Sequence, residues 1–74
     1  MKIYCDRHRH LICVPYTIEN LHKIAIKLGI KRCWFHNKQD YPHYDIPKKR
    51  KWEIENSVDV TVVSTRQLLE IIKL

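Results

Sequence analysis

The sequence predicts a small α/β or α+β domain in which a three-stranded sheet is covered by about three helices. Three observations favour this class. Short apolar segments contain β-branched residues, one longer segment repeats its apolar residues at helical spacing, and an S-x-x-Q pair can open a further helix. In chain order we expect a strand, a strand, a helix, a long loop, a helix, a strand and a helix. The chain is too short to be divided, so residues 1–74 are predicted to form a single domain.

The first half of the chain is predicted to contain two strands and the longest helix. KIYC at residues 2–5 and HLICVPY at residues 10–16 have the composition of strands, and residues 6–9 would form a turn without Gly or Asn. Thr17 can cap a helix with apolar residues at helical spacing, and Gly29 is placed to end it.

The second half is predicted to contain a loop, a helix, a strand and a last helix. Residues 30–45 have no sustained period and are expected to form a long structured loop. Asp45 could cap a short helix from about residue 46 to 56, and VDVTVV at residues 58–63 is the clearest strand. A capping box at residues 64–67 opens the final helix.

Composition narrows the function classes. Fourteen Lys and Arg against eight Asp and Glu give a net charge of +6, so the surface attracts phosphates, nucleic acid or an acidic protein. No apolar run is long enough for a signal peptide or a membrane span, so we expect a cytoplasmic protein without a membrane partner. Three cysteines, an odd number, are expected to be reduced thiols. A single Gly excludes Gly-rich phosphate loops, and a domain of this size often relies on a partner subunit, so a homodimer is one expectation.

Four consecutive cations follow the long loop. Lys48, Lys49, Arg50 and Lys51 fall in the first turns of the predicted second helix, where the helix dipole disfavours positive charge. The arrangement favours an anion-binding role, because helix N-terminal amides and nearby cations together attract phosphate. The alternative is a solvated basic face.

Upstream of these cations, His43 and Asp45 would point the same way on an extended chain, and either can transfer a proton or bind a metal. Asp6 stands at the C-terminal end of the first predicted strand, where open α/β sheets place functional carboxylates. If the loop folds back over that strand end, Asp6, His10, His43 and Asp45 share one cleft with Arg50. In the alternative, Asp45 is only a helix cap and His43 a polar loop residue.

Two Cys-x-x-His pairs provide a second set of candidate metal ligands. Cys5 with His8 and Cys33 with His36 have ligand-like spacing for a structural zinc ion. This spacing is far less diagnostic than Cys-x-x-Cys, and Cys13 and Cys33 beside apolar neighbours are more simply interpreted as small buried hydrophobic residues. Structural zinc is therefore disfavoured, whereas a divalent metal held by Asp6 and Asp45 stays open.

Seven short motifs together resemble a small family of bacterial and phage proteins, domain of unknown function 4031. The motifs are YCD at 4–6, HL at 10–11, LHKIAIKLGI at 21–30, WFH at 34–36, HYD at 43–45, KR at 49–50 and STRQL at 64–68. They cover nearly the whole chain in order.

The resemblance implies recurring residues at eleven positions, several of them polar groups with no packing reason to recur. These are Tyr4, Asp6, His10, His22, Trp34, Phe35, His43, Tyr44, Asp45, Arg50 and Arg66. Such a set favours a shared polar site. Family members often have a second acid where this chain has Arg7, which counts against a two-carboxylate metal site, and Val where it has Cys5, which counts against zinc. The family has no established activity.

Our leading hypothesis is a binding module for a phosphate-bearing partner, either nucleic acid or a nucleotide. The module would use the His-Tyr-Asp segment, with His43 and Asp45, and the basic helix start. The partner-binding residues would be His10, Tyr44, Lys49, Arg50 and Arg66.

The second hypothesis is a metal-dependent or His-assisted hydrolase of phosphodiesters or nucleotides. In it, Asp6 and Asp45 are the metal ligands and His43 is the acid or base. The third is an interaction protein that modulates a host protein through the aromatic residues of the long loop.

Overall fold

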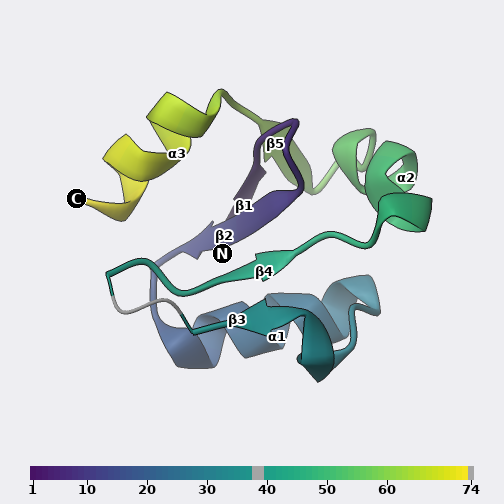
Figure 1. Ribbon diagram of the computed structural model, residues 1–74, viewed down its shortest axis with the longest axis horizontal. Helices are drawn as coiled ribbons and strands as arrows, with labels where there is room; N and C mark the ends of the chain where they lie inside the picture. The colour runs from purple at the N-terminus through teal and green to yellow at the C-terminus, as the bar shows by residue number, and fades with distance from the viewer. Residues whose placement is uncertain (38–39, 74) are drawn as a thin grey trace.

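The computed structural model describes residues 1–37 and 40–73, which form an α+β fold around one mixed sheet (Figure 1). Five strands, three α-helices and two 3-10 helices succeed one another in the described residues. They are β1 (Lys2–Cys5), β2 (His10–Val14), α1 (Ile18–Leu28), η1 (Arg32–Trp34), β3 (Phe35–His36), β4 (His43–Asp45), η2 (Lys48–Arg50), α2 (Lys51–Glu55), β5 (Val60–Val62) and α3 (Thr65–Ile72).

The predicted three-stranded sheet and the predicted order of elements are wrong. The sheet has five strands in the order β3-β4-β2-β1-β5, with β1 and β5 parallel and the other neighbours antiparallel. Two strands lie within residues 30–45, where the sequence predicts a loop. The sequence does not indicate them, because β3 and β4 have only two and three residues, too few to show the period of a strand, and they contain His and Asp.

The hairpin between β1 and β2 turns without Gly or Asn because Asp6 supplies the turn chemistry. Its Oδ1 accepts hydrogen bonds from the backbone N–H groups of His8 and His10 at 2.9 and 3.0 Å. Arg9 takes a left-handed φ of 70° within this turn. The side chain of Asp6 therefore shapes the loop that leads into β2.

The first and last predicted helices are confirmed together with their caps. Thr17 Oγ1 accepts from the backbone N–H of Asn20, and Gly29 ends α1 with a φ of 73°. The predicted capping box between Ser64 and Gln67 opens α3.

The predicted cap of the second helix is wrong. Asp45 lies in β4, and the backbone first forms the 3-10 turn η2 after Pro47 before it continues as the five-residue helix α2. The four cations therefore do not stand at the N-terminus of a long α-helix, and the anion-binding argument from the helix dipole no longer applies to them.

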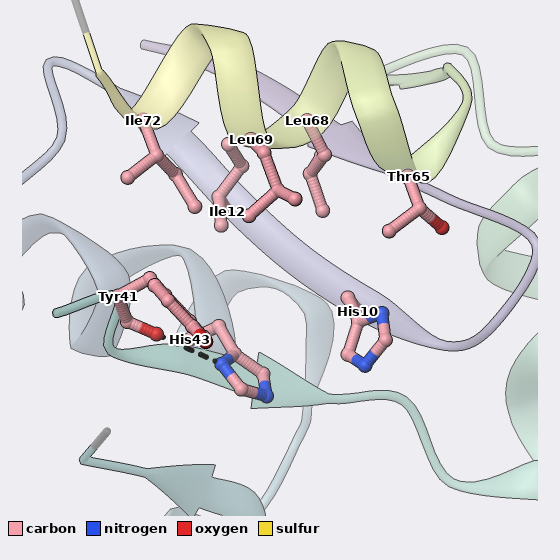
Figure 2. A pocket seen from close by; sticks show the side chains of 8 residues that line it. All are labelled: His10, Ile12, Tyr41, His43, Thr65, Leu68, Leu69 and Ile72. Carbon is pink, nitrogen blue, oxygen red and sulfur yellow. Dashed lines mark hydrogen bonds between the residues drawn. The ribbon is translucent and has the colours of Figure 1, made fainter. Parts of the chain in front are cut away.

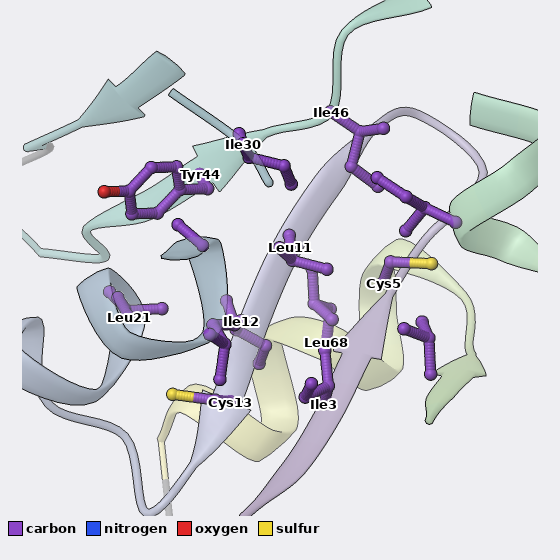
Figure 3. Packing of buried hydrophobic residues seen from close by; sticks show 14 residues of the cluster. Ile3, Cys5, Leu11, Ile12, Cys13, Leu21, Ile30, Tyr44, Ile46 and Leu68 are labelled. Atoms are coloured by element: carbon purple, nitrogen blue, oxygen red, sulfur yellow. The ribbon is translucent and has the colours of Figure 1, made fainter. Parts of the chain in front are cut away.

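The two long helices pack on opposite faces of the sheet. Tyr44 in β4 hydrogen-bonds His22 of α1, whereas its neighbours His43 and Asp45 point to the other face, which α3 covers. Fourteen buried residues form the core, which is drawn in Figure 3. Cys5 and Cys13 belong to this core, but Cys33 is exposed, contrary to expectation.

Within the described residues, none of the helices has the length and apolar character that crossing a membrane requires.

Candidate metal centre

Three potential metal ligands gather on the face of the sheet that α3 covers. His10 lies opposite Asp45 in the β2–β4 register, and His43 precedes Asp45 by two residues on β4, so the three side chains share one face. One ligand atom from each residue lies within 4.8 Å of the other two. The side chains of His10, His43 and Asp45 are 38%, 12% and 26% exposed, so an ion can reach them from solvent.

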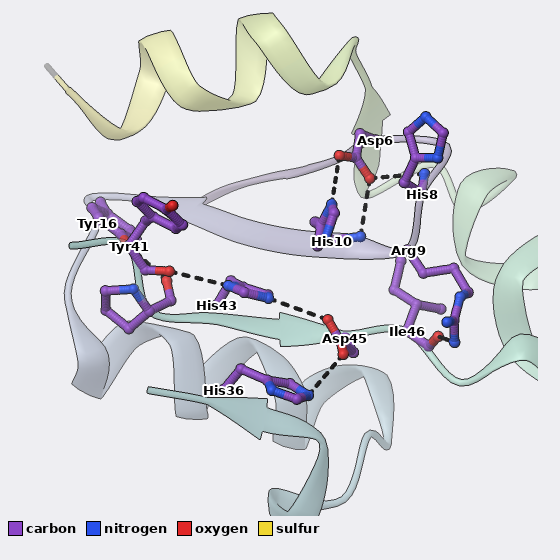
Figure 4. A network of polar contacts seen from close by, with 11 residues as sticks. Asp6, His8, Arg9, His10, Tyr16, His36, Tyr41, His43, Asp45 and Ile46 are labelled. Atoms are coloured by element: carbon purple, nitrogen blue, oxygen red, sulfur yellow. Dashed lines mark hydrogen bonds and ion pairs between the residues drawn. The ribbon is translucent and has the colours of Figure 1, made fainter. Parts of the chain in front are cut away.

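His10 is oriented by a buried carboxylate (Figure 4). Its Nδ1 lies 2.8 Å from Oδ2 of Asp6, which is fully buried. Burial alone would raise the pKa of Asp6, but hydrogen bonds from Thr65, His10 and His8 lower the pKa below its usual value. An ionised carboxylate only accepts, so Nδ1 of His10 donates, and in the neutral ring Nε2 keeps a free lone pair.

His43 is oriented by a backbone carbonyl. Its Nδ1 lies 3.0 Å from the carbonyl oxygen of Tyr41, and because a carbonyl only accepts, Nδ1 must carry the proton. Its Nε2 lies 3.2 Å from Oδ1 of Asp45. In a neutral imidazole that nitrogen is an acceptor facing another acceptor, so a proton or a cation is needed between them. A metal ion would meet this requirement at both atoms.

The second oxygen of Asp45 is held by His36 of the neighbouring strand β3. Nε2 of His36 lies 2.7 Å from Asp45 Oδ2, and the His36 ring stacks on His43 at a centroid distance of 5.6 Å (Figure 4). His36 therefore fixes the carboxylate so that Oδ1 faces His43.

The three candidate ligands match the preferences of borderline divalent ions. Metal–ligand bonds of about 2.1 Å require ligand atoms roughly 3 to 3.5 Å apart, a spacing that His43 and Asp45 already have. Two imidazoles and one carboxylate on one side of an ion suit Zn²⁺ or Fe²⁺ better than Mg²⁺ or Ca²⁺, which prefer oxygen ligands. Positions on the opposite side stay open for water or substrate.

A pocket of about 180 Å³ adjoins the ligands between α3 and the sheet (Figure 2). His10, His43 and Thr65 line one end of it. Its other lining residues are apolar or aromatic: Ile12, Tyr41, Leu68, Leu69 and Ile72. The candidate metal centre thus opens onto a space that a small molecule can enter.

Residues 4–73 match the family model described as protein of unknown function (DUF4031). The chain belongs to this family. No curated protein and no solved structure matches it. The family model therefore covers nearly the whole of the chain.

In this DUF4031 protein, four of the five residues expected to share a cleft lie together. Asp6, His10, His43 and Asp45 form a continuous set of contacts, although both oxygens of Asp6 are engaged by hydrogen bonds and Asp6 supports His10 instead of facing the pocket. Arg50 does not join them. Its guanidinium donates to the carbonyl oxygen of Gly29.

The cations after β4 have different environments. Arg50 also pairs with Glu53 at 2.7 Å, which raises the pKa of Arg50 and lowers the pKa of Glu53. Lys51 pairs with Glu55 at 2.9 Å. Lys48 and Lys49 are exposed and, within the part of the chain that the structure describes, form no ion pair.

The remaining predicted site residues lie apart from the cluster. Tyr44 is buried on the α1 face, where its hydroxyl lies 2.7 Å from Nδ1 of His22. Arg66 is exposed in the first turn of α3. Trp34 and Phe35 pack against the core, whereas Tyr41 is exposed.

The Cys-His pairs do not enter the ligand cluster. Burial raises the pKa of the Cys5 thiol to about 11, with the carboxylates of Glu55 and Asp6 adding to the effect, so this thiol stays protonated and is a poor zinc ligand. Among the described residues, His10, His43 and Asp45 are the one group of three or more potential ligands close enough to hold an ion.

Sequence reasoning missed three contributors to the site. Thr65 donates its hydroxyl proton to Asp6 Oδ2 at 2.7 Å, across 59 residues of sequence. His36 was considered only as a zinc ligand, and Tyr41 acts through its backbone carbonyl, which has no sequence signature. His36 and His43 are paired across β3 and β4, so their side chains share a face, but only the folded chain establishes this pairing.

Proposed function

We propose that this protein is a metal-dependent hydrolase of phosphate esters. The observation that supports the proposal is the arrangement of His10, His43 and Asp45, whose ligand atoms converge while other groups orient both imidazoles. A site with three protein ligands on one side keeps open positions, as catalytic metal sites do.

The chemistry follows from the open positions. His10, His43 and Asp45 would hold the ion, and a Zn²⁺ ion held there would lower the pKa of a coordinated water toward neutrality and so supply a nucleophile. The water oxygen attacks phosphorus, the phosphorus–oxygen bond to the leaving group breaks, and the leaving oxygen takes up a proton. The sum is the addition of one water across that bond.

Phosphate is the favoured substrate class because of charge. The chain has a net charge of +6, so its field attracts anionic substrates and repels cations other than those that a carboxylate holds. A divalent ion also stabilises the negative charge that develops on phosphoryl oxygens.

The test combines metal binding and turnover. Zn²⁺ and Mn²⁺ binding is measured by titration calorimetry, and hydrolysis is followed with bis(p-nitrophenyl) phosphate as the probe. We expect His10→Ala and His43→Ala each to lower metal affinity by at least about 100-fold and to abolish metal-dependent turnover.

The matched control is His8→Ala. His8 is exposed and lies two residues before His10, but its side chain does not belong to the ligand group. This variant should keep wild-type affinity and turnover. Equal metal binding by the wild type and His43→Ala would overturn the proposal.

A second candidate function is nucleic-acid binding at the basic turn, and a separate observation favours it. The Trp52 side chain is 77% exposed in α2, and Lys49 and Lys48 precede it by three and four residues, about one helical turn. An exposed aromatic ring beside ammonium groups is the arrangement on which single-stranded bases stack while the phosphates are neutralised.

The salt dependence of oligonucleotide binding tests this second candidate. Replacing Lys48 and Lys49 by Gln should reduce the slope of log affinity against log salt by about 0.7 for each phosphate that the protein no longer neutralises. The control removes the same charge elsewhere, by Lys23→Gln with Lys27→Gln on α1. If both double variants bind alike, the basic turn is not the contact surface.

A further inference from the structure

We infer that the substrate of the candidate metal centre is a phosphate ester with a compact apolar group attached directly to a phosphate oxygen, and that this group occupies the pocket beneath α3. The inference rests on the proposed function and specifies its substrate. Phosphate esters in which the phosphate is linked only to a polar group, such as a ribose, are excluded as substrates.

The two ends of the pocket differ in chemistry. His10, His43 and Thr65 line the end next to the metal ligands, whereas Ile12 and Leu68 are buried side chains of its apolar part. Figure 2 shows the side chains of α3 pointing down toward the two imidazoles on β2 and β4. A molecule in this pocket therefore has a polar group at one end and an apolar group at the other.

The volume limits the apolar group to about one ring. The pocket measures about 180 Å³, and an apolar cavity of about 150 Å³ is known to hold a benzene molecule. A phenyl ring or a short branched alkyl chain fits this space, whereas a longer chain would extend into solvent.

The open side of the pocket is also apolar. Leu69 and Tyr41 line the pocket on this side. Both are large side chains, and they are 38% and 45% exposed to solvent. A bound ring would cover them and remove apolar surface from water, which is the main source of affinity in pockets of this kind.

Both imidazoles take part in the pocket wall and in the ligand group, so the open coordination positions adjoin the apolar space. A phosphate bound at these coordination positions lies next to the apolar space. No long linking group therefore fits between the phosphate and an apolar ring in the pocket. This adjacency is the reason for placing the apolar group directly on the phosphate oxygen.

Two stable probes test the inference on the intact protein loaded with Zn²⁺. Phenylphosphonate and methylphosphonate present the same anionic head with and without a ring, and neither is hydrolysed at its phosphorus–carbon bond. Titration calorimetry should show that phenylphosphonate binds about 10- to 100-fold more tightly, as expected for burial of a ring.

Variants at the entrance show where the ring binds. Leu69→Gln and Tyr41→Ala should each reduce the ratio of the two affinities at least about threefold, since each loses part of the apolar wall. Tyr41→Ala keeps the backbone carbonyl that orients His43. The matched control is Ile26→Gln on α1, a 79% exposed apolar side chain outside the pocket, which should leave the ratio unchanged.

The outcomes separate the inference from the proposed function. If Zn²⁺ itself does not bind, the proposed function fails and the inference fails with it. If Zn²⁺ binds but the two phosphonates have equal affinities, or if Ile26→Gln lowers their ratio as much as Leu69→Gln, the metal centre stands and the substrate assignment is overturned.

Discussion

At the scale of single residues, Asp6 has the largest number of structural roles in the candidate site. Its two carboxylate oxygens accept from the backbone N–H groups of His8 and His10, from the His10 ring and from the Thr65 hydroxyl. One side chain thus closes the hairpin, orients a candidate ligand and connects the sheet to α3. A fully buried carboxylate is stable there because each oxygen has two partners.

Replacing Asp6 by Asn tests this role. The amide has nearly the same shape but loses the charge and directs an NH₂ group at donors, so we expect a loss of about 2 to 4 kcal/mol in the free energy of unfolding. Metal affinity should fall about 10- to 100-fold, because the orientation of His10 is lost. Urea denaturation and Zn²⁺ titration measure the two effects, and Asp59→Asn at an exposed carboxylate is the control.

The position of Asp6 was predictable from its place at a strand end, and so was the shared direction of His43 and Asp45 from their spacing. The contacts with Thr65 and His36 were not, because they join residues that only the folded chain brings together. Arg50 was expected in the cleft because it lies in the cationic run at the start of the predicted second helix and in the KR motif. A carboxylate three residues later, on Glu53, holds it locally.

At the scale of elements, local signals predicted the helices better than the strands. The caps of α1 and α3 involve neighbouring residues, so the sequence shows both partners of each hydrogen bond. β4 is held by hydrogen bonds to β2, which is distant in sequence, and to the two-residue strand β3, and it places polar side chains on one face. A strand of this kind has no apolar period by which it could be recognised.

The end of α1 depends on Gly29. Its φ of +73° is left-handed, so Gly29→Ala should lower the free energy of unfolding by about 1 kcal/mol. Asn tolerates this conformation better than Ala, so Gly29→Asn should be the milder change. Thermal denaturation of both variants measures the difference. If the Gly29→Ala variant is as stable as the wild type, the left-handed conformation at position 29 is not what ends α1.

The contact between α1 and β4 should make the free energy of unfolding depend on pH. Burial, with a contribution from Arg32, lowers the pKa of His22, which faces the Tyr44 hydroxyl. The folded protein therefore binds fewer protons than the unfolded chain below the ordinary His pKa of about 6.5. Stability should decrease as the pH falls from that value toward the folded-state pKa, and it should level off below it.

Urea denaturation at a series of pH values from about 8 to about 5 measures this effect, because an ordinary histidine changes its charge within this range. His22→Gln should flatten the decrease, whereas His8→Gln at an exposed histidine should leave the profile as in the wild type. If both variants show the wild-type slope, another group causes the dependence.

At the scale of the whole molecule, the candidate centre joins three strands and α3. The ligands come from β2 and β4, and their supporting groups come from β3, from the residue after β1 and from the start of α3. Binding energy at such a centre adds to the folding energy, because the unfolded chain does not hold these groups together.

Zn²⁺ should therefore raise the thermal midpoint of the whole domain. At a free concentration 100 times the dissociation constant, the gain is about 2.7 kcal/mol, and a chelator should reverse it. Differential scanning calorimetry of the wild type and His43→Ala measures the gain. An equal rise in both proteins would mean that the ion binds elsewhere.

The hydrogen bond from Thr65 to Asp6 also bears on the order of events during synthesis. It joins residues 59 positions apart, and its donor lies at the first residue of α3. The β1–β2 hairpin can form as soon as it leaves the ribosome, but the carboxylate beneath His10 stays incompletely bonded until α3 has also emerged. The apolar pocket, whose wall includes Leu68, Leu69 and Ile72, likewise forms only after α3 has been made.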